Sequence, residues 1–284
     1  MVQSRSQLGV IRSAPLVGQE HGAGLISYGV PFLLSAETGA LLGRMKRHAP
    51  HGSVPSERLP ADARRFALRH ARRKLGYEVF ANETRLEDAE GLDDALTLLG
   101  VHMMIHVAEH APEYVFLHAG VVAWEDRALL LPGASHAGKS TLVAELVRAG
   151  ATYYSDEFAL LDSEGSVHPF TRAIRLRRPG ETDQVPLPSW QLDGRAGTVP
   201  LPVSMVVFAQ FAKHARWAPE PVTPGRAVLE LLLHSTPVQR TPDRTLATLS
   251  AMVRNARVWR SPRGEAAVAA RSLLAALASG GPPV

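Results

Sequence analysis

The sequence predicts an α/β fold in which a smaller α+β subdomain precedes the core. Two observations predict the core. An apolar run over 128–131 leads into a glycine-rich loop and then a helical pattern over 141–148, and a longer run over 114–124 is apolar and β-branched, as buried strands are. Another apolar strand is expected over 203–211. Helical patterns follow near 225–234, 243–255 and 264–278.

Composition restricts the class of protein. The 284 residues, 45% of them hydrophobic, are enough for a large core domain that carries a smaller one. No run approaches the roughly 18 apolar residues of a membrane helix, and the N-terminus lacks a secretory apolar block, so we expect a cytoplasmic protein without membrane contact. The absence of cysteine excludes disulfides, thiolate metal sites and thiol catalysis.

The chain divides into two expected domains, an N-terminal α+β subdomain over 1–111 and a catalytic domain over 112–284. Short apolar pieces at 24–28 and 31–34 are candidate strands of the first domain. Its further expected elements are a helix over 64–75, a strand over 77–81 and a helix over 92–110. A proline-rich interval, 179–202, is expected to be a long active-site or subunit-contact loop of the second domain.

A basic stretch lies on the first of those expected helices. Its members are Arg64, Arg65, Arg69, Arg72, Arg73 and Lys74. It could contact an anionic partner, or it could be a solvated face with packed arginine stems. No aromatic residues interleave to stack on bases, so we favour the solvated face and expect no nucleic-acid partner.

Three histidines recur every fourth residue on the second expected helix. His102, His106 and His110 would share one face and could hold a metal ion. Glu109 is near, but the sequence shows no clear carboxylate partner for the three histidines. We favour a partly buried polar edge or subunit contact.

The most informative segment is G-A-S-H-A-G-K-S-T, which matches the phosphate-binding loop pattern. Its glycines let successive backbone N–H groups turn toward an anion, its lysine reaches the terminal phosphates, and its serine hydroxyl holds magnesium. The expected nucleotide-binding residues are Gly133, Ala134, Ser135, His136, Ala137, Gly138, Lys139, Ser140 and Thr141. A strand before the loop and a helix after it are the context that the chemistry requires, so we expect ATP and Mg²⁺ to bind.

Two adjacent carboxylates, Asp156 and Glu157, follow the next expected strand. Phosphoryl transfer requires a phosphate cradle, magnesium, a base for the acceptor and positive charge for the transferring group. Ser140, Asp156 and Glu157 are the expected metal ligands, and the two carboxylates could divide metal coordination and general-base duty.

Four segments together resemble a known family. They are H-A-G-V at 118–121, the loop G-A-S-H-A-G-K-S, S-D-E at 155–157 and T-P-G-R at 223–226. In order and spacing, over about residues 112–235, they resemble the C-terminal domain of bacterial HPr serine kinase/phosphorylase and, more closely, HPr kinase-like proteins. The resemblance implies a phosphate-loop core akin to that of phosphoenolpyruvate carboxykinase, with ATP- and magnesium-dependent phosphorylation of a serine-type hydroxyl. It also suggests a homo-oligomer.

The resemblance implies a role for each matching residue. His118 would lie beside the phosphate site, Lys139 and Ser140 would be loop ligands, and Asp156 would be the base. Arg226 would contact a phosphate or the transition state. The expected catalytic residues are therefore Asp156, His118, Lys139 and Arg226, and Glu157 replaces a second aspartate of the family.

The chain departs from the family after the two carboxylates. A glutamate metal ligand and a glycine-rich turn are not evident, and 167–176 instead reads V-H-P-F-T-R-A-I-R-L. The resemblance therefore does not extend to HPr as the acceptor or to the reverse reaction. Arg172, Arg175 and Arg177 alternate along an expected strand, where they could meet a phosphate or acidic substrate, or form an ordinary exposed face.

These observations predict a kinase that transfers the γ-phosphoryl group of ATP to a hydroxyl of a protein, peptide or small molecule. A carboxykinase-like enzyme would need further ligands for an organic acid, and the sequence shows no candidates for them. The alternative from another class is a nucleotide-binding scaffold or regulatory protein without transfer activity. His118, Asp156 and Arg226 favour the kinase, because a nucleotide sensor needs no base on the acceptor side.

Overall fold

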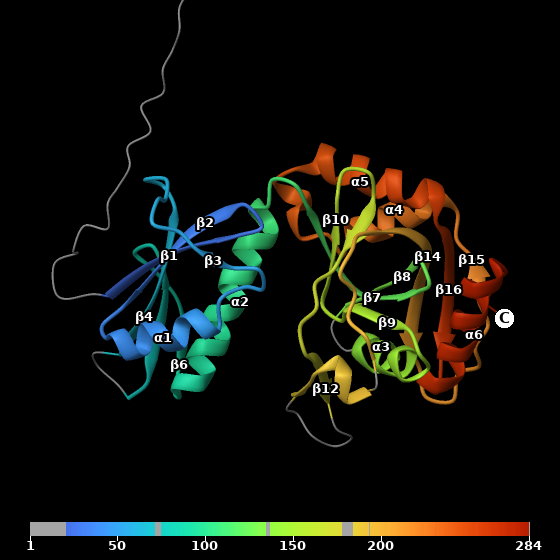
Figure 1. Cartoon of the computed structure of the whole chain (residues 1–284), viewed down its shortest axis with the longest axis horizontal. Coiled ribbons are helices and arrows are strands. Elements are labelled where there is room, and N and C mark those ends of the chain that lie inside the picture. Colours follow the sequence, from blue (N-terminus) through green and yellow to red (C-terminus); the bar gives the residue numbers. More distant parts are fainter. Residues whose placement is uncertain (1–20, 72–74, 135–136, 178–183, 193, 284) are drawn as a thin grey trace, which may run out of the picture. The chain divides into compact units, whose positions relative to one another are not determined.

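The computed structural model describes residues 21–71, 75–134, 137–177, 184–192 and 194–283. Contacts between Cα atoms divide the chain into two compact units, Met1–Pro112 and Glu113–Val284. The expected domain boundary lies one residue earlier, between 111 and 112. Helices and strands are mixed in both units (Figure 1), so the expected α/β class is confirmed, whereas the kinase-like core remains a prediction.

The N-terminal unit is a six-stranded sheet with two helices on one face. Its strands are β1 (His21–Ser27), β2 (Val30–Ala36), β3 (Val54–Pro55), β4 (Arg64–His70), β5 (Tyr77–Ala81) and β6 (Thr84–Ala89). Their order is β3-β1-β2-β4-β5-β6, with only β2 and β4 paired in parallel. Helices α1 (Gly39–Arg47) and α2 (Leu92–His110) touch each other and the sheet (Figure 1). Phe32, Phe66, Leu99 and Met103 are fully buried between them.

The helix expected over 64–75 is wrong, because Arg64–His70 is the strand β4. Its Ala, Leu and Arg residues are good helix formers, but β4 pairs with β2 on one side and β5 on the other. Burial of Phe66, Ala67 and Leu68 between these partners overrides local propensity. Residues 72–74 lie outside the described ranges.

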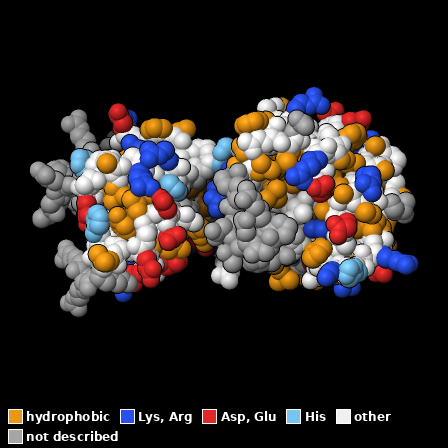
Figure 2. Space-filling view, turned by 90° about the horizontal axis from the view of Figure 1, so that it is seen from below, with side chains coloured by type: hydrophobic (Ala, Val, Ile, Leu, Met, Phe, Trp, Pro, Cys, Tyr) orange, Lys and Arg blue, Asp and Glu red, His pale blue; other side chains and the backbone are white. Residues whose placement is uncertain are grey.

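Three arginines of the expected basic stretch therefore lie on a strand, and each has a local partner. Arg65 is ion-paired with Glu83, Arg69 lies 4.8 Å from the ring centre of Phe80, and Arg64 lies 5.7 Å from that of Phe66. Figure 2 shows both acidic and basic side chains on the visible face of each unit. These contacts lie within the unit, and the expected absence of a nucleic-acid partner stays a prediction.

The C-terminal unit is built on an eight-stranded sheet of order β11-β10-β7-β8-β14-β16-β15, in which β9 also pairs with β7. The strands are β7 (Val115–Trp124), β8 (Arg127–Pro132), β9 (Thr152–Ser155), β10 (Phe158–Leu161), β11 (Ser166–His168), β14 (Leu201–Phe211), β15 (Glu220–Pro221) and β16 (Arg257–Arg263). The helices are α3 (Lys139–Arg148), α4 (Pro224–Leu232), α5 (Pro242–Asn255) and α6 (Ala266–Ser279), with 3-10 turns η1 (Ser189–Leu192) and η2 (Thr236–Gln239). Strands β8, β14 and β16 are parallel neighbours.

Helices cover both faces of these parallel strands. Leu129 and Leu131 of β8 point into a core formed with α3 and α6, whereas Leu130 points into a second core formed with α4 and α5. This explains why residues 128–131 of β8 are all apolar. The carboxyl ends of β8, β14 and β16 meet at one edge of the sheet, and ligands bind at such edges in α/β proteins.

Two parts of the C-terminal unit differ from expectation. The interval 179–202 contains the strand β13 (Gln184–Leu187), which pairs with β12 (Ile174–Arg177), and the turn η1, so it is not one long loop. Strand β16 was not expected, because R-V-W-R-S-P-R combines charge with a proline. Pro262 is accommodated because β15 pairs only with Trp259 and Arg260 on that side of β16.

Candidate functional site

The phosphate-loop segment lies between strand β8 and helix α3, at the carboxyl edge of the parallel strands. Residues 135 and 136, two of the expected nucleotide ligands, lie outside the described ranges. Gly138 precedes α3 with φ of +81°, a conformation that favours glycine. A Cβ at Gly138 would also come within 2.3 Å of Nη2 of Arg263, so a larger residue would displace this guanidinium.

Lys139 is buried although it is cationic, with 8% of its surface exposed. Its Nζ donates to the carbonyl oxygens of Gly133 at 2.7 Å and Ala134 at 2.8 Å. Burial lowers the pKa of Lys139 to about 8, while Asp156 and Glu157 act in the opposite direction. A lysine is seldom buried without an anionic partner, so the loop is suited to receive a negative group at Nζ.

His118 of β7 lies beside the loop. Its backbone N–H donates to the carbonyl of His234 at 2.8 Å, and its own carbonyl accepts from the N–H of Gly133 at 3.4 Å. Burial, together with the nearby Lys139 and His234, lowers the pKa of His118 to about 4. The imidazole is therefore neutral at pH 7 and can accept or donate one hydrogen bond at the loop.

Asp156 follows β9 and is 8% exposed. Its Oδ1 accepts from the hydroxyl of Tyr153 at 3.1 Å, and its Oδ2 accepts from the backbone N–H of Arg175 at 3.0 Å. Burial and the neighbouring Asp156 raise the pKa of Tyr153 well above its ordinary value, so this hydroxyl stays protonated as a donor. The two bonds fix the carboxylate and leave each oxygen a further lone pair.

Glu157 is held by its backbone and by an ion pair. Its carbonyl accepts from the N–H of Ala119 at 3.2 Å, and its Oε2 accepts from Nη1 of Arg172 at 2.8 Å. Burial raises the pKa of Glu157, whereas Arg172 lowers it. Arg172 precedes β12 and so does not share a strand with Arg175 and Arg177, unlike the expected alternation.

Arg226 is the one expected catalytic residue that the structure does not place against the described part of the loop. It lies in the first turn of α4 with a side chain that is 68% exposed, and its Nε is 3.7 Å from Oε1 of Glu230. Glu230 is also ion-paired with Arg260 of β16. Arg260 and Glu230, rather than Arg226, line a pocket beside the loop.

That pocket holds about 600 Å³. It is lined by Gly133, Ala134 and Ala137 of the loop, Phe208–Ala212 of β14 and its end, Leu233 and His234 after α4, and Arg260–Pro262 of β16. The sequence indicated none of the β14 and β16 residues as functional, because these residues reach the loop only through the pairing of β8 with β14 and of β14 with β16.

Magnesium requires oxygen ligands, and it is bound in nucleotide sites by one or two carboxylates together with phosphate oxygens. The half-buried hydroxyl-bearing Ser140 and the buried Asp156 have this chemistry. Glu157 is engaged with Arg172. Within the described ranges, no three His, Cys, Asp or Glu side chains gather as a metal site. Ser140 and Asp156 therefore have the chemistry to hold a metal jointly with phosphates.

The spaced histidines of α2 are held by their own neighbours. His102 is 2.8 Å from Oε1 of Glu87, and Nδ1 of His110 donates to the carbonyl of His106 at 2.8 Å. The rings of His106 and His110 lie 4.2 Å apart. They form a partly buried polar edge, which is one of the two interpretations that the sequence favoured, and a subunit contact stays a prediction.

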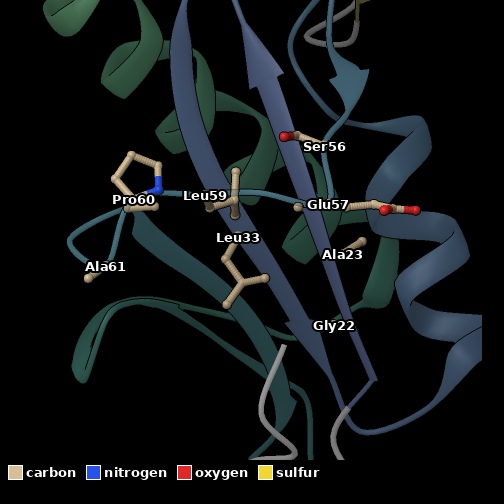
Figure 3. Close-up of a pocket in the computed structure, with 10 residues that line it drawn as sticks. Gly22, Ala23, Leu33, Ser56, Glu57, Leu59, Pro60 and Ala61 are labelled. Atoms are coloured by element: carbon tan, nitrogen blue, oxygen red, sulfur yellow. The ribbon is translucent and has the colours of Figure 1, made fainter. Parts of the chain in front are cut away.

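The N-terminal unit has a pocket of its own, of about 530 Å³, between β1, β2 and the segment after β3 (Figure 3). Leu33, Leu59 and Pro60 form much of its wall, and Glu57 is the one titratable side chain among the described residues that line it. This pocket offers no constellation for catalysis.

Comparison with known proteins assigns no family to this chain. No family model matches the sequence, and no curated protein matches it. A solved structure of the HPr(Ser) kinase/phosphatase from Coxiella burnetii is similar at 13% identity, covering 58% of this chain and 94% of that chain, with a TM-score of 0.30. Such a distant likeness assigns neither fold nor activity. None of the helices in the described residues is long and apolar enough to cross a membrane.

Proposed function

We propose that the C-terminal unit binds ATP with magnesium and transfers the γ-phosphoryl group to a hydroxyl acceptor of the serine type, on a protein, peptide or small molecule. The observation that carries the proposal is the burial of Lys139 between loop carbonyls, near Asp156 and Glu157. The residue types and their proximity match the requirements of phosphoryl transfer.

Each residue has a distinct task in this proposal. Backbone N–H groups at the start of α3 and the ammonium of Lys139 bind the β- and γ-phosphates. Magnesium, held by Ser140 and Asp156 with the phosphates, would neutralise charge on the transferring group. Asp156 takes the proton of the acceptor hydroxyl while the hydroxyl oxygen attacks the γ-phosphorus. The bond between the γ-phosphorus and the bridging β-phosphate oxygen breaks, and ADP leaves.

Neighbouring groups support these tasks. Tyr153 and the backbone of Arg175 orient the Asp156 carboxylate, and Arg172 neutralises Glu157 so that two carboxylates can stand together. The neutral His118 can hydrogen-bond to a phosphate oxygen or the incoming hydroxyl.

A nucleotide-binding protein without transfer activity is the second candidate. It is favoured by the position of Arg226, which leaves the described part of the site without the expected transition-state arginine. Substitution Asp156→Asn separates the candidates. A kinase loses about 10²- to 10⁴-fold in phosphoryl transfer from labelled ATP, or in ATP turnover, while its ATP affinity stays within a few-fold. A variant that turns over ATP at the wild-type rate would exclude Asp156 as the base.

A further inference from the structure

The two sides of the phosphate loop differ in chemistry. The side toward β7 and β9 carries the neutral imidazole of His118 and the carboxyl groups of Asp156 and Glu157. The opposite side, at the ends of β14 and β16, carries the aromatic rings of Phe208 and Phe211. Arginines lie against both rings, with Cζ of Arg260 5.6 Å from the ring centre of Phe208 and Cζ of Arg263 5.4 Å from that of Phe211.

Phe211 is fixed to the loop but open to solvent. It is the last residue of β14, and its backbone N–H donates to the carbonyl of Ala137 at 3.4 Å. Half of its surface is exposed, although it is a large apolar side chain. It lines the 600 Å³ pocket on one side and a second pocket, of about 350 Å³, on the other. An exposed aromatic ring held at a phosphate loop is available for stacking.

The second pocket continues directly from the start of α3. Gly138, Thr141 and Glu145 form one wall, and Arg263, Gly264 and Glu265 form the turn that faces them. Its volume lies at the lower end of small-molecule sites, about 300–1,000 Å³. Glu145 is ion-paired with Arg148, and Glu265 adds a second carboxylate to the lining. Both carboxylates can accept hydrogen bonds from ribose hydroxyls.

Arg263 provides the second wall of this site and is itself held by the loop. It is 3% exposed, and its Nη2 donates to the carbonyl of Gly138 at 2.7 Å. Its buried Nε has no hydrogen-bond partner among the described residues. Arg263 therefore connects Phe211, Gly138 and the pocket, because its buried guanidinium lies beside the ring and is bonded to the loop.

We propose that Phe211 stacks against the nucleobase of a nucleoside triphosphate, whose ribose lies in the pocket of Thr141, Glu145, Arg263, Gly264 and Glu265. The terminal phosphate then points away, toward Lys139 and Asp156. This inference rests on the proposed function, because the phosphates in the loop place the nucleoside.

The test compares two ligands, ATP and inorganic tripolyphosphate, both with magnesium, by calorimetry. Stacking of a base on an aromatic ring contributes on the order of a tenfold factor in affinity. Phe211→Ala should therefore weaken ATP binding about tenfold and leave tripolyphosphate binding unchanged, and Phe211→Trp should retain ATP affinity. Phe211→Leu, which keeps an apolar side chain, should behave like Phe211→Ala and guards against a folding defect.

Leu246→Ala is the matched control, because Leu246 of α5 is 47% exposed, close to the 50% of Phe211, and lines neither of these two pockets. It should bind ATP as the wild type does. Equal ATP affinities of wild type, Phe211→Ala and Phe211→Leu would overturn this inference while leaving the proposed function intact. Failure of the wild type to bind either ligand would instead overturn the proposed function, and this inference with it.

Discussion

The guanidinium of Arg263 donates from Nη2 to the carbonyl oxygen of Gly138 at 2.7 Å, so the last residue of β16 holds the last loop residue before α3. A second bond runs from Nη1 to the carbonyl of Gly264 at 3.0 Å. Strand β16 therefore supports the phosphate loop, although about 125 residues separate the two in sequence.

Removal of this support should destabilise the unit and weaken nucleotide binding. Arg263→Met retains much of the buried stem and loses both bonds, and hydrogen bonds to charged groups contribute about 1.5–3 kcal/mol. We expect a lower free energy of unfolding in urea and a weaker ATP affinity. All four tryptophans (Trp124, Trp190, Trp217 and Trp259) lie in the C-terminal unit, so their fluorescence reports its unfolding. An unchanged urea midpoint would show that the bond contributes nothing.

Tyr153 should affect the rate of transfer rather than nucleotide affinity. Tyr153→Phe removes the hydroxyl that donates to Oδ1 of Asp156 and leaves the buried ring in place. A less well oriented base should lower kcat by about tenfold, with the dissociation constant of ATP unchanged. Single-turnover transfer and calorimetry measure the two quantities separately. Loss of ATP affinity without loss of kcat would assign Tyr153 a purely structural role.

The lowered pKa of His118 predicts how the free energy of unfolding depends on pH. Burial lowers its pKa to about 4 in the folded protein, against an ordinary value of 6.5. The unfolded state therefore takes up a proton first as the pH falls, and the free energy of unfolding decreases between pH 6.5 and 4, by at most about 1.4 kcal/mol per pH unit for one group. His118→Asn should make this decrease shallower in urea titrations at pH 7, 6 and 5. His234 shifts in the same direction, so part of the slope should remain. Identical slopes in the two proteins would contradict this account.

The ion pair between Arg172 and Glu157 should contribute only modestly to stability. Both side chains are about one-third to two-fifths exposed, at 34% and 41%, so solvent screens their attraction. A double-mutant cycle with Arg172→Met and Glu157→Gln should give a coupling free energy of about 0.5–1 kcal/mol. A coupling near zero would mean that Arg172 does not neutralise Glu157.

Much of the fold could be predicted because its periodicities are strong. The helix over 92–110 was expected with the bounds that α2 has, and the strand–loop–helix order around Lys139 was also correct. Long apolar or amphipathic runs leave little freedom for other assignments. Strand β4 was mistaken for a helix because its propensity favours helix while its strand partners, distant in sequence, decide otherwise.

The candidate site could be predicted only where its residues lie near a motif. Asp156 was expected because it follows the strand after the loop and its helix, whereas His118 was expected through the resemblance. Phe211, Arg260 and Arg263 were missed because they reach the loop through β14 and β16, and no local pattern reveals which strands are neighbours in a parallel sheet. Arg226 was expected through resemblance alone, and its described partner is Glu230.

The central claim is that the loop around Lys139 is a working nucleotide site. Its most direct test is the unfolding temperature, followed by tryptophan fluorescence, with and without ATP and magnesium, for the wild type and for Lys139→Ala. A ligand at about 100 times its dissociation constant stabilises the folded state by about 2.7 kcal/mol, so the wild type should melt at a clearly higher temperature with ATP and the variant should not. Equal responses of the two proteins, or no response of the wild type, would contradict the account.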